Sequence, residues 1–225
     1  MTGKLLVVVR FGGFAVNLIV WRTLLNHALP PGVGFPLAIV PILAVFPTVW
    51  LARRTVDASP SVERTAMVTG ILHFLLMLFL GSSVIEAIEV FRAVPGWVVP
   101  VPLWISGVLL GLTGIFVALT VVNLALAGLG APFAIALSKR LATGWMYSWT
   151  RNPMVLATLA FLVVAGLYLR SLLFVSWALL LVSPAWLYAV RVYEERELEI
   201  RFGPEYQLYK ETTPFLWPRR PKRSL

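Results

Sequence analysis

Apolar residues dominate this chain in long runs, and short segments that carry charges and prolines separate the runs. Crossing the hydrocarbon core of a bilayer takes about 20 apolar residues, and a segment in lipid must satisfy its own backbone hydrogen bonds, as a helix does. We therefore predict an all-α polytopic membrane protein with about six transmembrane helices. The predicted spans are residues 5–25, 34–51, 66–85, 97–126, 154–169 and 171–190.

The last two predicted spans are joined only by the residues around Arg170 and Ser171. So short a connection forces two helices into an antiparallel hairpin. The segment 151–153, where the first of these helices starts, should therefore lie beside residues 194–195, where the second leaves the membrane. Pro184 lies inside the last span and is expected to kink it.

The basic residues predict an orientation in the membrane. With six spans, both termini share a side with the second and fourth connections, and only Arg22, Arg92 and Arg170 of the 19 basic residues fall on the other side. Lys and Arg collect on the cytoplasmic side of membrane proteins. We therefore expect both termini to be cytoplasmic. The membrane is expected to be the plasma (inner) membrane. Topology then accounts for the net charge of +9 without a nucleic-acid partner.

The polar composition narrows the possible chemistry. The chain has no cysteine, which excludes disulfides and thiolate catalysis, and only two histidines, His27 and His73, which argues against a zinc site. His73 lies inside the third predicted span, where an ionisable group is a functional candidate. The alternative is a neutral histidine that forms a hydrogen bond between helices, the role we also expect for Asn17 and Asn123.

Two clusters on the predicted cytoplasmic side combine aromatic, basic and acidic residues. One covers residues 144–153, and the other covers residues 194–209. Carboxylates beside aromatic rings suit a cationic ligand, whereas an arginine suits a carboxylate or a phosphate. The two clusters together suit a zwitterionic ligand near the lipid headgroups.

Four short motifs in the second part of the chain have a defined order and spacing. They are Gly144-x-x-Tyr147-x-x-x-Arg151-Asn152-Pro153-Met154, Glu194-Glu195-x-x-Leu198, Phe202-Gly203-x-x-Tyr206-x-x-Tyr209 and Pro214-x-x-x-Pro218. This pattern resembles the isoprenylcysteine carboxyl methyltransferase and phospholipid methyltransferase superfamily of membrane enzymes. The resemblance covers residues 128–219. We therefore divide the chain into N-terminal transmembrane helices, residues 1–127, and a methyltransferase-like core, residues 128–225.

The resemblance implies S-adenosylmethionine as the cofactor, held in a cytoplasmic pocket at the ends of the last helices. It implies as methyl acceptor a lipid or membrane-soluble amphiphile that offers a carboxylate, an amine or a thiol. It gives Arg151 and Glu195 catalytic roles and no role to a metal. It implies cofactor contacts for Gly128, Gly130, Gly144, Tyr147, Arg151, Asn152, Pro153, Glu194 and Glu195.

The chain departs from the superfamily pattern at several positions. Asn152 stands where many relatives have histidine, Met154-Val155 where a tyrosine is frequent, and Phe215 where an arginine often follows the first tail proline. These departures bear on the identity of the substrate. Whether Glu194 and Glu195 act as a base or only bind the donor's ammonium group stays open.

Other interpretations stay open as well. A nicotinamide-dependent membrane reductase of the sterol-reductase type has a similar helical core, although the lack of cysteine counts against it. A non-catalytic lipid-binding or assembly subunit is a further alternative. The glutamates at 194 and 195 could also decorate a solvated helix face, where Arg191 would pair with them and Glu197 with Arg201.

Overall fold

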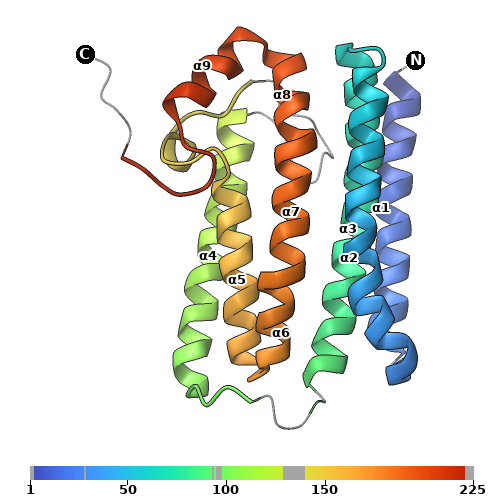
Figure 1. The fold of residues 1–225 in the computed structure, drawn as a ribbon, viewed down its shortest axis with the longest axis vertical. Coiled ribbons are helices and arrows are strands. Elements are labelled where there is room, and N and C mark those ends of the chain that lie inside the picture. The colour runs from blue at the N-terminus through green and yellow to red at the C-terminus, as the bar shows by residue number, and fades with distance from the viewer. Residues whose placement is uncertain (1–2, 28, 93, 95–97, 129–139, 221–225) are drawn as a thin grey trace.

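The computed structural model describes residues 3–27, 29–92, 94, 98–128 and 140–220. Within these residues the regular structure is helical, without a strand, so the predicted all-α class is confirmed (Figure 1). The α-helices are α1 Gly3–Asn26, α2 Pro31–Asp57, α3 Val62–Arg92, α4 Leu103–Gly128, α5 Pro153–Tyr168, α6 Leu172–Trp177, α7 Ser183–Ala189, α8 Glu195–Phe202 and α9 Pro204–Thr212. Three tighter or wider segments join them: the 3-10 turn η2 Trp145–Ser148 and the π-helical segments η3 Ala178–Val182 and η4 Val190–Glu194.

Among the described residues, four helices are long and apolar enough to cross a membrane, and they indicate an integral membrane protein. They are Pro31–Asp57, Val62–Arg92, Leu103–Ala127 and the continuous helix Leu172–Phe202, which contains α6, η3, α7, η4 and α8. The apolar helix α5 has 16 residues. At about 1.5 Å per residue it is shorter than the roughly 30 Å of a bilayer core. The count of six spans therefore stays a prediction.

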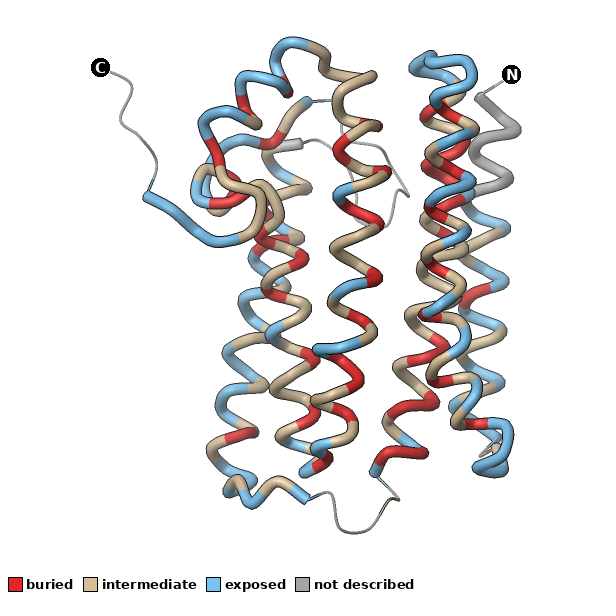
Figure 2. Tube along the Cα trace, viewed as in Figure 1, coloured by how far each residue is buried: buried red, intermediate tan, exposed pale blue. Residues whose placement is uncertain are grey.

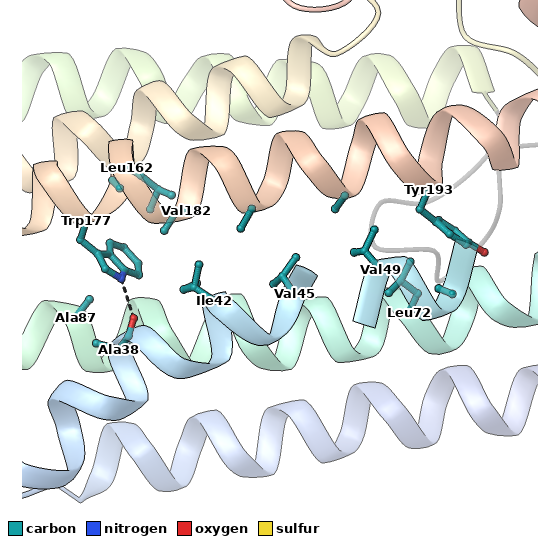
Figure 3. Close-up of a cluster of buried hydrophobic side chains, with 14 of the residues drawn as sticks. Ala38, Ile42, Val45, Val49, Leu72, Ala87, Leu162, Trp177, Val182 and Tyr193 are labelled. Atoms are coloured by element: carbon teal, nitrogen blue, oxygen red, sulfur yellow. Dashed lines mark hydrogen bonds between the residues drawn. The ribbon is translucent and has the colours of Figure 1, made fainter. Parts of the chain in front are cut away.

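The continuous helix Leu172–Phe202 runs between the α1–α3 group and the α4–α5 pair (Figures 1 and 2). Its buried face meets α2, where Ile42, Val45 and Val49 recur at helical spacing and are almost fully buried (Figure 3). Trp177 adds a polar contact to this interface, because its indole Nε1 donates to the backbone carbonyl of Ala38 over 2.7 Å. The core therefore lies between α2–α3 and the continuous helix.

At Pro41 of α2 a side chain from a neighbouring helix replaces the backbone hydrogen bond that a proline removes. Pro41 of α2 has no N–H, which leaves the carbonyl of Leu37, four residues earlier, without its helical donor. The hydroxyl of Ser83 on α3 donates to this carbonyl over 3.1 Å. Near Pro184 the helix continues, but it widens into η3, and the Ser183 hydroxyl donates to the Ala178 carbonyl. The expected disturbance at Pro184 thus takes the form of a π-helical segment.

The fourth predicted span begins later in the structure than predicted. Its predicted first residue, Trp97, lies outside the described residues, and the described residues 98–102 are not helical. Helix α4 starts only at Leu103, directly after Pro100 and Pro102. A proline disfavours helical geometry in the residue before it, which explains the shorter helix.

The polar side chains inside the helices behave in three different ways. Asn17 of α1 donates to the carbonyl of Phe74 on α3 over 3.2 Å, so the predicted interhelical bond is confirmed. Asn123 of α4 instead accepts from the backbone N–H of Met146 in η2. For His73 the prediction of an interhelical hydrogen bond is wrong. Its Nδ1 lies 2.8 Å from the carbonyl of Thr69, in the same helix.

The contact between α5 and α6 can be tested at Gly166. A Cβ at this position would lie 2.7 Å from Val175 Cγ2 and 3.0 Å from the backbone nitrogen of Val175, which cannot yield without moving α6. We expect Gly166→Ala to lower the free energy of unfolding by about 1–3 kcal/mol, measured by denaturant unfolding in detergent. Gly111→Ala on α4 is the matched control, because no atom lies within 4 Å of its Cβ. Equal stability of the two variants would contradict this packing.

Candidate functional site

A buried ion pair joins the two polar clusters that the sequence places far apart. Arg151 precedes α5, and Glu195 is the first residue of α8; Arg151 Nη1 lies 2.9 Å from Glu195 Oε1. Each side chain is only 7% exposed. The predicted adjacency of residues 151–153 and 194–195 is therefore found. The alternative of a solvated helix face is wrong for Glu195, although its ion pairs Arg191–Glu195 and Glu197–Arg201 are both present.

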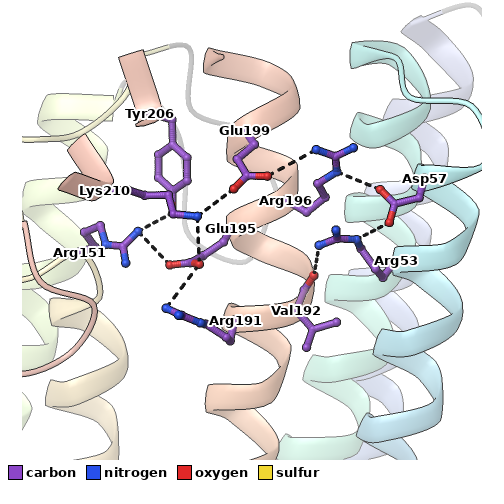
Figure 4. A network of polar contacts seen from close by, with 10 residues as sticks. All are labelled: Arg53, Asp57, Arg151, Arg191, Val192, Glu195, Arg196, Glu199, Tyr206 and Lys210. Carbon is purple, nitrogen blue, oxygen red and sulfur yellow. Dashed lines mark hydrogen bonds and ion pairs between the residues drawn. The ribbon is translucent and has the colours of Figure 1, made fainter. Parts of the chain in front are cut away.

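Further polar groups surround this ion pair (Figure 4). Arg191 Nη1 and Lys210 Nζ each lie 3.6 Å from Glu195 Oε2. The hydroxyl of Tyr206 accepts a hydrogen bond from Arg151 Nη1 over 3.4 Å. Burial raises the pKa of the Tyr206 hydroxyl, and the charge of Glu195 adds to the rise. The single carboxylate is thus held by three cations, and Tyr206 stays a neutral phenol.

A chain of ion pairs continues from this centre to α2 (Figure 4). Lys210 Nζ lies 2.8 Å from Glu199 Oε1, and Arg196 Nη1 lies 3.4 Å from Glu199 Oε2. Arg196 Nε in turn lies 2.9 Å from Asp57 Oδ1, at the end of α2. These outer side chains are about a third exposed, so water screens them more than it screens the buried pair.

The C-terminal tail holds the segment around η2 in position. The buried Tyr209 hydroxyl donates to the carbonyl of Tyr147 over 2.6 Å. The backbone N–H groups of Arg151 and Arg219 donate to the carbonyls of Pro214 and Trp149, respectively, both over 2.9 Å. Tyr206 and Tyr209 are both buried, so their rings pack the tail onto the core.

Two departures from the superfamily pattern meet in the structure. The side-chain amide of Asn152 donates to the backbone carbonyl of Phe215 over 2.8 Å. The ring of Phe215 lies under two guanidinium groups, with its centroid 5.0 Å from Arg191 Cζ and 5.8 Å from Arg151 Cζ. A ring face attracts such cations. An arginine at position 215 would instead meet two like charges.

A cavity of about 550 Å³ lies between the α1–α3 group and the second half of the chain. The volume falls within the range of ligand pockets, about 300–1,000 Å³. Four of the predicted site residues line it: Tyr147, Arg151, Asn152 and Glu194. The remaining wall is largely apolar and includes Leu72, Leu76, Met77, Leu80, Val84, Leu162, Val182 and Trp186. The cavity thus has a polar part and an apolar part, as an amphiphile does.

The π-helical segment η4 separates the roles of the two adjacent glutamates. Glu194 ends η4 and lines the cavity, whereas Glu195 begins α8 and faces Arg151. Arg53 of α2 braces this wider turn, because its Nη1 donates to the carbonyl of Val192 over 2.8 Å. Burial, and then the charge of Glu194, raise the pKa of Tyr147. Tyr147 therefore keeps its phenolic hydrogen beside the Glu194 carboxylate.

A second cavity of about 850 Å³ lies on another face of α5 and η2. Its wall is mainly apolar and contains Phe116, Trp145, Trp149 and Pro153. Pro153, predicted to contact the cofactor, lines this cavity and not the first. The two tryptophans are strongly exposed, as rings of an interfacial aromatic belt are, whereas Tyr147 is buried.

Of the glycines predicted to contact a cofactor, Gly144 is not among the described residues that line the first cavity. Gly144 is exposed at the start of η2, and a Cβ there would meet no atom within 4 Å. Gly128 ends α4, and Gly130 lies outside the described residues. Within the described part of the chain, no group of three or more His, Cys, Asp or Glu could hold a metal. The cofactor roles given to these glycines stay predictions.

Three polar residues of the cavity wall were not among the predicted site residues. They are His73, Thr158 and Tyr193. His73 carried a signal, its depth in a predicted span, but nothing in the sequence related it to the Arg151 cluster. Thr158 and Tyr193 line the cavity only because of the way the helices pack, which the sequence does not show.

Comparison of the chain with protein-family models, with curated proteins and with solved structures found no match. The geometry of the site therefore carries the argument about function.

The buried ion pair can be tested by removing one partner. Arg151→Met keeps the length of the side chain but leaves Glu195 buried with only the more distant Arg191 and Lys210. We expect a loss of about 3 kcal/mol in the free energy of unfolding, since a buried charge loses its main partner. Arg196→Met, in the more exposed pairs with Asp57 and Glu199, should cost about 1 kcal/mol or less. Similar losses in both variants, measured in detergent, would refute a special role for the buried pair.

Proposed function

We propose that this chain is an S-adenosylmethionine-dependent methyltransferase that acts on a lipid or membrane-soluble amphiphile. One observation carries the proposal: Tyr147, Arg151, Asn152 and Glu194, from two distant segments, line one cavity whose remaining wall is largely apolar. A site of this kind offers a cation and an anion to a polar ligand and a hydrocarbon surface to an apolar one.

The charged part of the cavity suits the amino-acid end of S-adenosylmethionine, which carries an ammonium and a carboxylate group. Arg151 is the group for the carboxylate, because its buried Nε finds no hydrogen-bond partner among the described residues. A buried N–H without an acceptor is costly, and an anionic ligand would remove that cost. Glu194 is the complementary group for the ammonium. Its neighbour Glu195 already faces three cations.

The apolar part of the cavity suits the chain of the methyl acceptor. Leu76, Leu80 and Val84 line it from α3, and Trp186 lines it from α7. Burial of a hydrocarbon against such a wall is favourable by roughly 25 cal/mol per Å² of apolar surface removed from water. The donor and acceptor would thus occupy different parts of one space.

Within this cavity the protein positions the reactants and excludes water. S-adenosylmethionine, when bound, would supply an electrophilic methyl group for a lone pair of the acceptor. A carboxylate acceptor needs no base, but an amine or a thiol must lose a proton. Glu194 is the cavity carboxylate that can accept it. Arg151 and Glu195 would contribute by holding the η2 segment against α8.

We further propose that α1 and α5 complete six spans, with α5 and the helix Leu172–Phe202 as the C-terminal hairpin. The polar part of the cavity would then face the cytoplasm, together with both termini. The charges support this orientation, because Arg53, Arg54 and Arg64 flank the α2–α3 connection, whereas Arg22, Arg92 and Arg170 lie toward the other ends of their helices.

Methyl transfer tests the proposed function directly. Purified protein is incubated with S-adenosylmethionine labelled in its methyl group and a total lipid extract, and label is counted in the organic phase. We expect label in lipid with the native chain and a reduction of at least about tenfold with Glu194→Gln, because a charge-assisted contact is lost. Glu205→Gln is the matched control, since Glu205 is exposed on α9.

The cofactor preference separates the competing functions. Stabilisation of the purified protein by S-adenosylmethionine, seen as a raised melting temperature, would support the proposal. Stabilisation by NADPH in its place would favour the membrane reductase. Protein that neither binds these cofactors nor transfers label would favour a non-catalytic lipid-binding role.

A further inference from the structure

The ring nitrogen Nε2 of His73 has no hydrogen-bond partner among the described residues, and it bears on which ligand the first cavity binds. His73 lies in the membrane-spanning helix α3 and lines the cavity that also contains Arg151 and Glu194. Its Nδ1 lies 2.8 Å from the carbonyl of Thr69. A carbonyl oxygen can only accept, so Nδ1 carries the hydrogen of this bond. In a neutral imidazole this leaves Nε2 as an acceptor.

The α3 wall around His73 is apolar, since its neighbours there include Leu72, Leu76 and Met77. Among the described residues, the other ionisable side chains that line the cavity are Arg151, Glu194, Tyr147 and Tyr193. No hydrogen bond between described residues engages His73 Nε2. In its neutral form, this cavity-lining residue therefore has an acceptor nitrogen without a donor among the described residues.

The position of this acceptor is fixed relative to the charged part of the cavity. Thr69 is fully buried, and its hydroxyl lies 2.9 Å from the hydroxyl of Tyr193, which is also buried. Tyr193 directly precedes Glu194 in η4. The same residue, Thr69, thus anchors His73 through its carbonyl and η4 through its side chain.

We propose that the cavity selects an amphiphile whose polar group carries a hydrogen on nitrogen, oxygen or sulfur, and that this group donates to His73 Nε2. An ionised carboxylate has no such hydrogen, and its oxygen lone pairs would be repelled by the lone pair of Nε2. Of the three acceptor classes, amines and thiols therefore fit the cavity and carboxylates do not; an alcohol would fit as well. The inference rests on the proposed function only in identifying this amphiphile as the methyl acceptor.

A pair of probes that differ in a single hydrogen-bond donor tests the proposal without any cofactor. Dodecanol carries an O–H group, and dodecyl methyl ether replaces its hydrogen by a methyl group. Binding to the full chain in detergent micelles is followed by the fluorescence of tryptophan, since Trp21 and Trp186 line the cavity. The affinity ratio of alcohol to ether is compared between the native chain and His73→Phe, so that the partition of each probe into micelles cancels.

We expect the alcohol-to-ether ratio to be roughly fivefold higher for the native chain than for His73→Phe, the size of one neutral hydrogen bond. His27→Phe, which changes the exposed histidine at the end of α1, should keep the native ratio. His73→Gln, which restores an acceptor oxygen, should recover part of it and guards against a folding defect in the phenylalanine variant.

Two results would overturn the inference. One is an equal ratio in the native chain and in His73→Phe, and the other is the absence of saturable binding of both probes. Failure of the proposed function has a different signature. In that case methyl transfer and S-adenosylmethionine binding are absent, while the alcohol-to-ether ratio still depends on His73.

Discussion

The architecture of the site depends on the burial of one ion pair, Arg151 with Glu195. Both side chains are almost fully buried, in a medium of low dielectric constant. If either moved away, the other would be a buried charge without a counter-charge, which is strongly destabilising. This constraint fixes the segment before α5 against the start of α8. The C-terminal tail can then fold over η2, and Glu194 and Tyr147 come to line the same cavity.

Sequence reasoning predicted the parts of this arrangement that follow from hydrophobic length and from short connections. The apolar runs predicted the helices, and the brief connection at Arg170 predicted that Arg151 would meet the glutamates at 194 and 195. Which glutamate lines the cavity could not be predicted. Adjacent residues on a helix point about 100° apart, and η4 changes the local period from that of an α-helix.

The α3 wall of the cavity could not be predicted from the sequence, for a different reason. Leu76, Leu80 and His73 belong to a helix whose composition is that of many membrane helices, and their common face becomes visible only when α3 packs against its neighbours. The pairing of Asn152 with Phe215 was hidden similarly. In the sequence, Asn152 and Phe215 are two separate departures from the superfamily pattern, but in the structure they form one contact. The Phe215 ring lies beside Arg151 and Arg191, so a cationic side chain in its place would be repelled.

The chain of charges from Asp57 to Lys210 has a consequence for how this protein can evolve. Asp57 and Arg196 are 139 positions apart in the sequence, yet they share a hydrogen bond. Loss of the aspartate would leave Arg53 and Arg196 side by side without their common counter-charge. Substitutions at positions 57 and 196 are therefore expected to occur together in descendant sequences. The N-terminal helices, although generic in composition, cannot diverge independently of the half that carries the site.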